Sequence, residues 1–249
     1  MGSIFSKLFE NKDILDFSVL NADMHSHLIP NIDDGSLSVQ ETYNMISGLQ
    51  ALGFKKFITT PHIMPEIFKN DADIILDRCT QLNAELKTTD TEIHVEAAAE
   101  YYIDEQFPGR IRNGEKFLTF GANYILIEVN MMAKEKRLEE VLFELNLKGY
   151  KPVLAHVERY PYMFEGNSLK YYSSLLDADV LLKVNLRSFT GQYGEIQKKI
   201  ARQLAEHKMI NFLGSDIHHE NQLPIIQQSM KDAYVQKLLA SNTLMNNQL

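Results

Sequence analysis

The sequence repeats one unit, a short apolar run typical of a β-strand followed by a stretch with helical periodicity. Seven such runs cover residues 19–25, 56–60, 93–99, 124–129, 152–156, 180–185 and 210–214. The helical stretches cover residues 38–52, 73–86, 135–147, 169–176, 196–207 and 224–239, and only the connection 101–123 lacks a regular pattern. This alternation predicts parallel strands with helices outside them.

Seven units in 249 residues favour a single α/β barrel over two doubly wound domains. An open doubly wound sheet is the alternative, but its Gly-rich phosphate loop is absent from the sequence. We predict one domain over residues 1–249, with an N-terminal extension at 1–18, the barrel at 19–240 and a tail at 241–249. Ser36 and Asp71 are predicted helix N-caps, and Gly53 and Gly149 are predicted helix stops.

Composition excludes several classes of protein. The chain has 33 Asp+Glu against 25 Lys+Arg, and this net charge of −8 argues against nucleic acid as a partner. The single cysteine, Cys79, permits no internal disulfide, which indicates a reducing compartment and hence the cytoplasm. No apolar run approaches the ~18 residues of a membrane span. Residues 1–6 match a short myristoylation pattern, and the alternative is a docking helix that buries Ile4, Phe5, Leu8 and Phe9.

Metal-competent side chains stand at the ends of six of the seven runs. They are His25 and His27, His62, Glu100, Glu128, His156, and Asp216 with His218. In a parallel barrel all C-terminal strand ends meet on one face, where active sites are built. A lone histidine or glutamate there is more often structural, but six such strand ends on one face predict a metal site with several ions. Imidazole and carboxylate together suit Mn, Fe or Zn better than Ca or Mg.

Six segments resemble the motifs of a known superfamily. They are DMHSHLIPNIDDGS at 23–36, TTPH at 59–62, AAEYY at 98–102, ILIEV at 125–129, LAHVERY at 154–160 and GSDIH at 214–218. In this order and spacing they resemble the polymerase and histidinol phosphatase (PHP) superfamily. The branch they resemble most is the bacterial capsular-polysaccharide protein-tyrosine phosphatases of the CpsB/YwqE type. The resemblance implies a distorted (β/α)7 TIM-like barrel with three divalent metal ions, most often Mn or Fe, with Zn possible.

The resemblance also implies nine metal ligands. Carried over residue by residue, the first ion takes His25, His27, Glu100 and Asp216, the second takes Glu100, Glu128 and His156, and the third takes Asp34, His62 and His218. Arg159 would contact the substrate phosphate, and it forms the implied catalytic set with His156 and Asp216. Family members usually carry a second arginine shortly after the D-x-H motif. Residues 216–223 contain no arginine, so only one of the two arginines expected to contact the phosphate is identified.

The resemblance implies hydrolysis of phosphotyrosine, with the tail of a membrane-associated bacterial tyrosine kinase that regulates capsular or exopolysaccharide synthesis as the protein substrate. Our hypothesis is in-line attack by a metal-bound hydroxide without a phosphoenzyme, so solvent oxygen should enter phosphate in a single displacement. A trapped phosphoenzyme would contradict it. The residues alone support only a metal phosphohydrolase. The alternatives are a small-molecule phosphatase of the histidinol-phosphatase kind and a non-catalytic, metal-stabilised binding protein.

Other residues near these motifs have less specific roles. Cys79 lacks the arginine of a C-x5-R nucleophile loop, because Glu85 stands at that position, and it is predicted to be an ordinary helix residue. Asp23 shares the parity of His25 and is a candidate to support a ligand by hydrogen bonding. His219 is predicted to point away from the site. Four tyrosines pack in the core or stack on a substrate ring, namely Tyr101, Tyr102, Tyr160 and Tyr162. The oligomeric state is not determined by the sequence.

Overall fold

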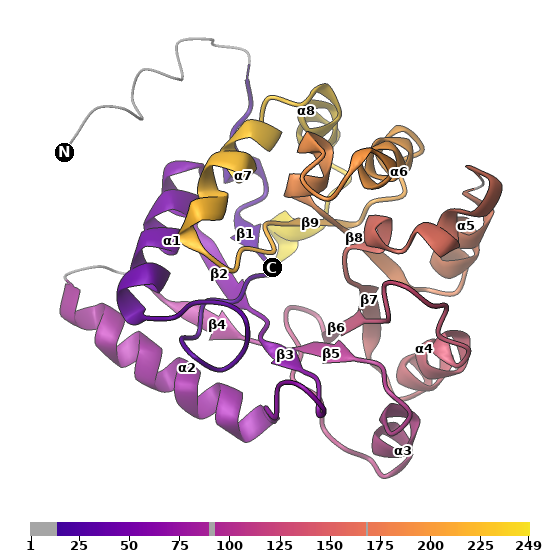
Figure 1. Ribbon diagram of the computed structural model, residues 1–249, viewed down its shortest axis with the longest axis horizontal. Coiled ribbons are helices and arrows are strands. Elements are labelled where there is room, and N and C mark those ends of the chain that lie inside the picture. The colour runs from indigo at the N-terminus through magenta and orange to yellow at the C-terminus, as the bar shows by residue number, and fades with distance from the viewer. Residues whose placement is uncertain (1–13, 90–92, 168) are drawn as a thin grey trace.

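The strands of this protein form a curled parallel sheet surrounded by helices, as a computed structural model shows (Figure 1). The structure describes residues 14–89, 93–167 and 169–249, so both predictions for residues 1–9 lie outside it. The strands are β1 Ala22–Asp23, β2 Lys56–Thr59, β3 His62–Ile63, β4 Val95–Ala97, β5 Glu100–Tyr102, β6 Tyr124–Glu128, β7 Lys151–Leu154, β8 Leu181–Asn185 and β9 Phe212–Gly214. Each of the seven predicted runs overlaps a strand, and β3 and β5 lie just beyond the second and third runs.

Every strand pair is parallel, in the orders β1-β2-β4 and β3-β5-β6-β7-β8-β9. The two orders arise because the second and third runs break and then continue as β3 and β5. The first break contains Pro61, which has no N–H for a strand ladder. At the far edges the chain after β1 meets the chain after β9, where Ser26 and Ile217 form a parallel bridge. The sheet therefore curls round on itself, as in a PHP-type barrel.

Eight helices in the described residues surround this sheet. They are α1 Val39–Ala51, α2 Ala72–Leu86, α3 Phe107–Arg112, α4 Leu138–Leu147, α5 Lys170–Asp177, α6 Glu195–Glu206, α7 Leu223–Ser229 and α8 Ala233–Ala240. The colour gradient runs once around the molecule, so α7 lies beside α1, and α8 packs against α6 (Figure 1). None of these helices is long and apolar enough to cross a membrane.

The structure corrects two predictions about helix boundaries. The predicted helix 224–239 is two helices, because the chain breaks after α7 and Asp232 caps α8 by accepting a hydrogen bond from Tyr234 N. The N-cap of α1 is Ser38 rather than Ser36, whose buried hydroxyl bonds to Thr42 instead. The Asp71 cap is confirmed, since its side chain accepts a bond from Ile74 N. Gly53 and Gly149 both have positive φ and are confirmed as helix stops.

Two apolar cores fill the inside and the outside of the curled sheet. The larger core lies between sheet and helices, and the smaller one contains Met24, which follows β1, and Ile58, Leu126, Val153 and Phe212 from four strands. Met245 and Leu249 of the C-terminal segment pack against this smaller core. Asn246 anchors that segment, because its side-chain nitrogen donates to Leu213 O at 2.7 Å. Apolar side chains thus fill the interior below the carboxyl ends of the strands.

Candidate metal centre

All nine predicted ligands lie together at the carboxyl end of the sheet. Seven of them line one cavity of about 600 Å³, and His25 and His27 are fully buried beside it. The same cavity is lined by two arginines, Arg159 and Arg187, and by Tyr193. The prediction that these strand ends share one face of the sheet is therefore confirmed.

The first group consists of His25, His27, Glu100 and Asp216. The Nε2 atom of His25 lies 3.1 Å from Glu100 Oε2, 3.2 Å from Asp216 Oδ1 and 3.4 Å from His27 Nε2. His27 Nε2 lies 3.6 Å from the same Glu100 oxygen and 3.7 Å from the same Asp216 oxygen. Ligands about 2.1 Å from one tetrahedral ion stand roughly 3.4 Å apart, so His25, His27 and Asp216 have the spacing of one ion's ligands, and a Glu100 oxygen lies within 3.6 Å of both histidines.

The remaining ligands form two further groups that share residues. Glu100 Oε1 lies 3.0 Å from His156 Nε2, which lies 3.5 Å from Glu128 Oε1, so Glu100 connects this group to the first. In the other group Asp34 Oδ1 lies 3.5 Å from Nε2 of both His62 and His218. The structure adds that His62 Nδ1 also faces Glu100 and Glu128, at 3.4 and 3.6 Å. His62 therefore lies between two groups.

Unsatisfied buried atoms indicate that these residues suit divalent cations. Within the described chain, Nδ1 of His62, Oε1 of Glu100 and Oε2 of Glu128 are buried without a hydrogen-bond partner, which is costly for such groups. Burial, and then the charge of Glu100, raise the pKa of Glu128 well above its usual value. Burial lowers the pKa of His25 to about 3, which keeps its ring in the neutral form that binds metals. A cation would relieve this crowding of carboxylates.

Unusual backbone conformations orient two of the predicted ligands. His156 has φ of 33° and Asp216 has φ of 52°, both in the left-handed region that costs a residue with a side chain about 1–3 kcal/mol. Each residue lies two positions after the end of a strand, His156 after β7 and Asp216 after β9. Gly35 shows a second constraint, since a Cβ there would lie 2.4 Å from the Cβ of His27. Only glycine lets the 33–35 segment approach His27 this closely.

Two aspartates support the predicted ligands by hydrogen bonding. Asp33 has no role predicted from the sequence. Its Oδ2 lies 2.7 Å from His27 Nδ1 and accepts a hydrogen bond from His62 N. A carboxylate in that position orients an imidazole ligand and selects its tautomer. Asp23 accepts hydrogen bonds from the backbone and side chain of Ser215, the residue before Asp216. The adjacent acids at 33 and 34 were the only sequence signal for Asp33.

Strand β8 was the one run without a predicted ligand, yet it contributes to the site. The side-chain nitrogen of Asn185 donates to Asp216 Oδ2 at 2.6 Å, and its backbone N–H donates to the buried Glu158 at 2.9 Å. Lys183 is fully buried and donates to Asn185 Oδ1. The available signal was that Lys183 and Asn185 alternate with apolar residues in a run that is otherwise buried.

Both arginines in the cavity stand on the same side of Asp216. Arg159 Nη1 lies 3.7 Å from Asp216 Oδ2, and Arg187 Nη2 lies 3.6 Å from that oxygen. Arg187 also donates to the backbone carbonyl of Asp216 at 2.5 Å. The guanidinium carbons lie 4.6 and 5.1 Å from the ring centre of Tyr193. Arg187 and Tyr193 are not among the residues predicted from the sequence.

The four tyrosines near the motifs do not line this cavity, whereas His219 does. Tyr101 and Tyr160 are buried, and their hydroxyls accept bonds from Leu118 N and Val129 N, so these two pack in the core. His219 lies at the cavity edge, but its Nδ1 faces Glu41 at 3.1 Å.

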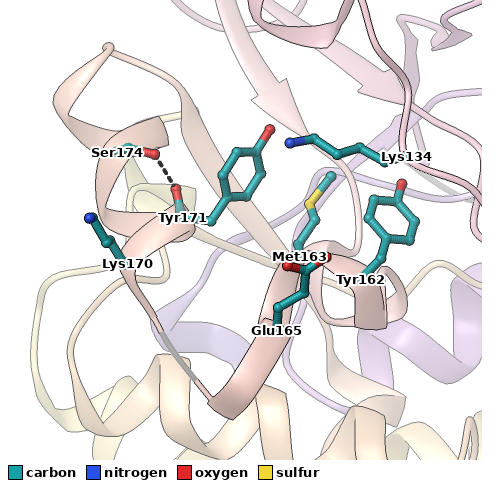
Figure 2. A pocket seen from close by; sticks show the side chains of 7 residues that line it. All are labelled: Lys134, Tyr162, Met163, Glu165, Lys170, Tyr171 and Ser174. Atoms are coloured by element: carbon teal, nitrogen blue, oxygen red, sulfur yellow. Dashed lines mark hydrogen bonds between the residues drawn. The ribbon is translucent and has the colours of Figure 1, made fainter.

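Tyr162 belongs to a neighbouring hollow of about 350 Å³. Figure 2 shows this hollow, which Lys134, Met163 and Tyr171 also line. None of the nine predicted ligands lines it. The chemistry that the nine residues can perform therefore belongs to the larger cavity.

Known proteins resemble this chain over most of its length. A family model described as capsular polysaccharide synthesis, CpsB/CapC, matches residues 21–246. Tyrosine-protein phosphatase YwqE of Bacillus subtilis is 29% identical over 197 residues, which are 79% of this chain and 77% of that protein. Tyrosine-protein phosphatase CpsB of Streptococcus pneumoniae is 24% identical over 220 residues, which are 86% and 90% of the two chains.

Solved structures extend the similarity to the fold. One chain, from crystal structures of YwqE from Bacillus subtilis and CpsB from Streptococcus pneumoniae described as unique metal-dependent tyrosine phosphatases, superposes with a TM-score of 0.74 at 26% identity. The match covers 90% of this chain and 94% of that one. Histidinol phosphate phosphatase of Lactococcus lactis matches at 0.51 and 15% identity over 88% and 93% of the chains, a likeness of fold alone. Because the family model spans residues 21–246, the chain belongs to the CpsB/CapC family of capsular polysaccharide synthesis.

Proposed function

We propose that this protein is a metal-dependent protein-tyrosine phosphatase, a phosphoric monoester hydrolase. The observation that carries the proposal is the convergence of nine metal-competent side chains on one cavity that also holds Arg159. The similarity to YwqE and CpsB, both named tyrosine-protein phosphatases, supports it.

The groups described above would hold three divalent ions, most readily Mn or Fe, with Zn possible. Mixed imidazole and carboxylate donors support this choice of metals. When bound, such ions supply positive charge to a phosphoryl group and make water a better nucleophile near neutral pH. The ligand set we propose is the predicted one, to which the structure adds the contacts of His62 with Glu100 and Glu128.

The protein's own residues supply binding and orientation. The guanidinium of Arg159 makes no hydrogen bond to any described residue, so its donors are available to phosphoryl oxygens. Asn185 and Asp33 hold Asp216 and His27 in fixed orientations. A phenolate leaving group, with a pKa near ~10, needs less protonation than an alkoxide does.

The rim of the cavity favours an aromatic phosphoester on a protein over a small polar one. Ile67, Phe68 and Met131 line it, and Ile67 is 66% exposed. Asp34, on the same rim, has a side chain that is 56% exposed. An open, partly apolar rim can contact a phenyl ring while leaving room for the peptide on either side of it.

The experiment that tests this function compares substrates on the metal-loaded protein. We expect a phosphotyrosine peptide to release phosphate faster than a phosphoserine peptide of the same sequence, and faster than histidinol phosphate. Preference for histidinol phosphate would support the small-molecule alternative. Absence of phosphate release from all three would support the non-catalytic alternative.

We expect Arg159→Gln to lower kcat/KM for the phosphotyrosine peptide by about 10–100-fold, because a charged donor to the phosphoryl group is lost. Steady-state phosphate release measures this. Arg112→Gln is the matched control, since Arg112 is 57% exposed and pairs with Glu140 and Glu144 on the surface. Equal activity of the Arg159 and Arg112 variants would remove Arg159 from the site.

Replacement of the single cysteine is expected to leave activity within about twofold of wild type. Cys79 lies on α2, where its Sγ donates to Val95 O, and burial raises the pKa of this thiol to about 11. It is therefore protonated at neutral pH and is no nucleophile. Assay of Cys79→Ser with the phosphotyrosine peptide checks this. A variant that is folded by circular dichroism but inactive would point to a cysteine mechanism.

Three finer points belong to the same proposal. The phosphotyrosine lies on the tail of a membrane-associated tyrosine kinase, and the protein works in the cytoplasm, as a chain with one cysteine permits.

The nine strand segments are seven strands of one (β/α)7 barrel, two of them interrupted. The parallel bridge between Ser26 and Ile217 and the separate core inside the sheet support this count. The whole chain is one domain, with the barrel at residues 19–240.

A further inference from the structure

We propose that Arg187 is a phosphate-binding residue that forms, with Arg159 and Tyr193, one anion site beside the metal centre. The inference rests on the proposed function, because the anion is the phosphoryl group of its substrate. The segment after His218 contains no arginine, so any second guanidinium for that group comes from elsewhere in the fold. Arg187 follows β8 and stands 31 positions before His218 in the sequence.

The position of Arg187 supports this role. Its side chain is only 4% exposed and lines the same cavity as Arg159 and the predicted ligands. Both guanidinium groups lie within 3.7 Å of Asp216 Oδ2, and both lie against the ring of Tyr193. Tyr193 thus holds two positive groups close together at the wall of the cavity. An anion bound there would offset their mutual repulsion.

Unused hydrogen-bond donors support it further. A guanidinium has five N–H groups, and the guanidinium of Arg187 makes one hydrogen bond to the described residues, from Nη2 to the carbonyl of Asp216. Its Nε is buried without a partner in the described chain. Asp216 does not need these donors, since Asn185 already donates to Oδ2 and Oδ1 faces the first ligand group. Planar guanidinium donors match phosphate oxygens in geometry and charge.

A purely structural role would make a different prediction. If Arg187 only holds the carbonyl of Asp216, its replacement disturbs a predicted metal ligand and lowers the metal content. If it binds the phosphoryl group, its replacement weakens the affinity for phosphate while the metal content stays. Metal content and phosphate affinity, measured on the same samples, therefore separate the two roles.

The experiment titrates inorganic phosphate into the full-length, metal-loaded protein by calorimetry, with metal content measured by elemental analysis. The variants are Arg187→Gln, Arg187→Lys and the surface control Arg112→Gln. We expect the Kd for phosphate to rise at least about tenfold in Arg187→Gln and less in Arg187→Lys, which keeps the charge but not the planar fork. Metal per chain should match wild type in the lysine variant, and the control should bind phosphate as wild type does.

An unchanged phosphate Kd in both Arg187 variants would overturn the proposal. Loss of metal in both variants would also overturn it, because Arg187 would then act through Asp216. If only the glutamine variant loses metal, the lysine variant is the test: a raised phosphate Kd supports the proposal, and an unchanged one overturns it. A wild-type protein that does not bind phosphate would overturn it as well. The proposed function fails separately, when the wild-type protein binds phosphate but does not hydrolyse the phosphotyrosine peptide.

Discussion

Replacing Asp216 with alanine is expected to lower kcat/KM for a phosphotyrosine peptide by about 10³-fold or more. The Oδ1 atom of Asp216 faces His25, while its Oδ2 accepts from Asn185 and faces both arginines. Its loss would remove one member of the first ligand group and the negative charge among those cations. A bound metal contributes several kcal/mol to such a reaction, and each 1.36 kcal/mol corresponds to a factor of about ten in rate.

The measurement is steady-state phosphate release with the metal concentration held constant, together with elemental analysis of the variant. Asp77→Ala is the matched control, because Asp77 is exposed on α2 and accepts a hydrogen bond only from Gln81 among the described residues. We expect that control to keep wild-type activity and metal content. An Asp216→Ala protein with near wild-type turnover would refute the assignment of the cavity as the active site.

Removal of metal by a chelator is expected to abolish phosphate release and to lower the melting temperature by about 5–10 °C. At a hundredfold excess over Kd, a bound ligand stabilises the folded state by about 2.7 kcal/mol, and a domain of this size shifts by about 2–4 °C per kcal/mol. The physical reason is that Glu100, Glu128 and Asp216 are buried together. Without cations, their mutual repulsion and burial oppose folding.

Thermal melts followed by circular dichroism check the shift, and adding Mn, Fe or Zn singly to the chelated protein tests which metal restores turnover. The control is chelator already saturated with metal, which should change neither quantity. A melting temperature that is the same with and without metal would contradict the site, since the buried carboxylates would then need no cation.

The metal-competent residues could be predicted from the sequence because their placement depends on local periodicity. Strand-like runs that end in a histidine or an acid place that residue at a carboxyl end, and parallel topology brings all carboxyl ends to one face. His62 and Glu100 show the limit of this reasoning. Each lies just past a break in its run, and β3 and β5 form only because neighbouring strands pair with them there.

Helix boundaries show a similar limit. The periodic pattern over residues 224–239 continues through the break between α7 and α8, although Asp232 supplies a local N-cap for α8. Ser36 has a good capping side chain, but burial next to Thr42 gives its hydroxyl another partner. For Ser36 a tertiary contact prevails over a local preference worth about 1 kcal/mol.

The sequence by itself determined the α/β alternation, the metal-competent residues and the absence of a cysteine nucleophile, because each depends on residue type and short-range spacing. Only the tertiary structure decided which side chains support those residues. Asp33 contacts His27, Asn185 contacts Asp216, and Arg187 lies beside Arg159 across Tyr193. The last two contacts join segments about 30 residues apart, and their geometry depends on the curl of the sheet and on the turn after β8. No periodicity along the chain encodes the geometry of these contacts.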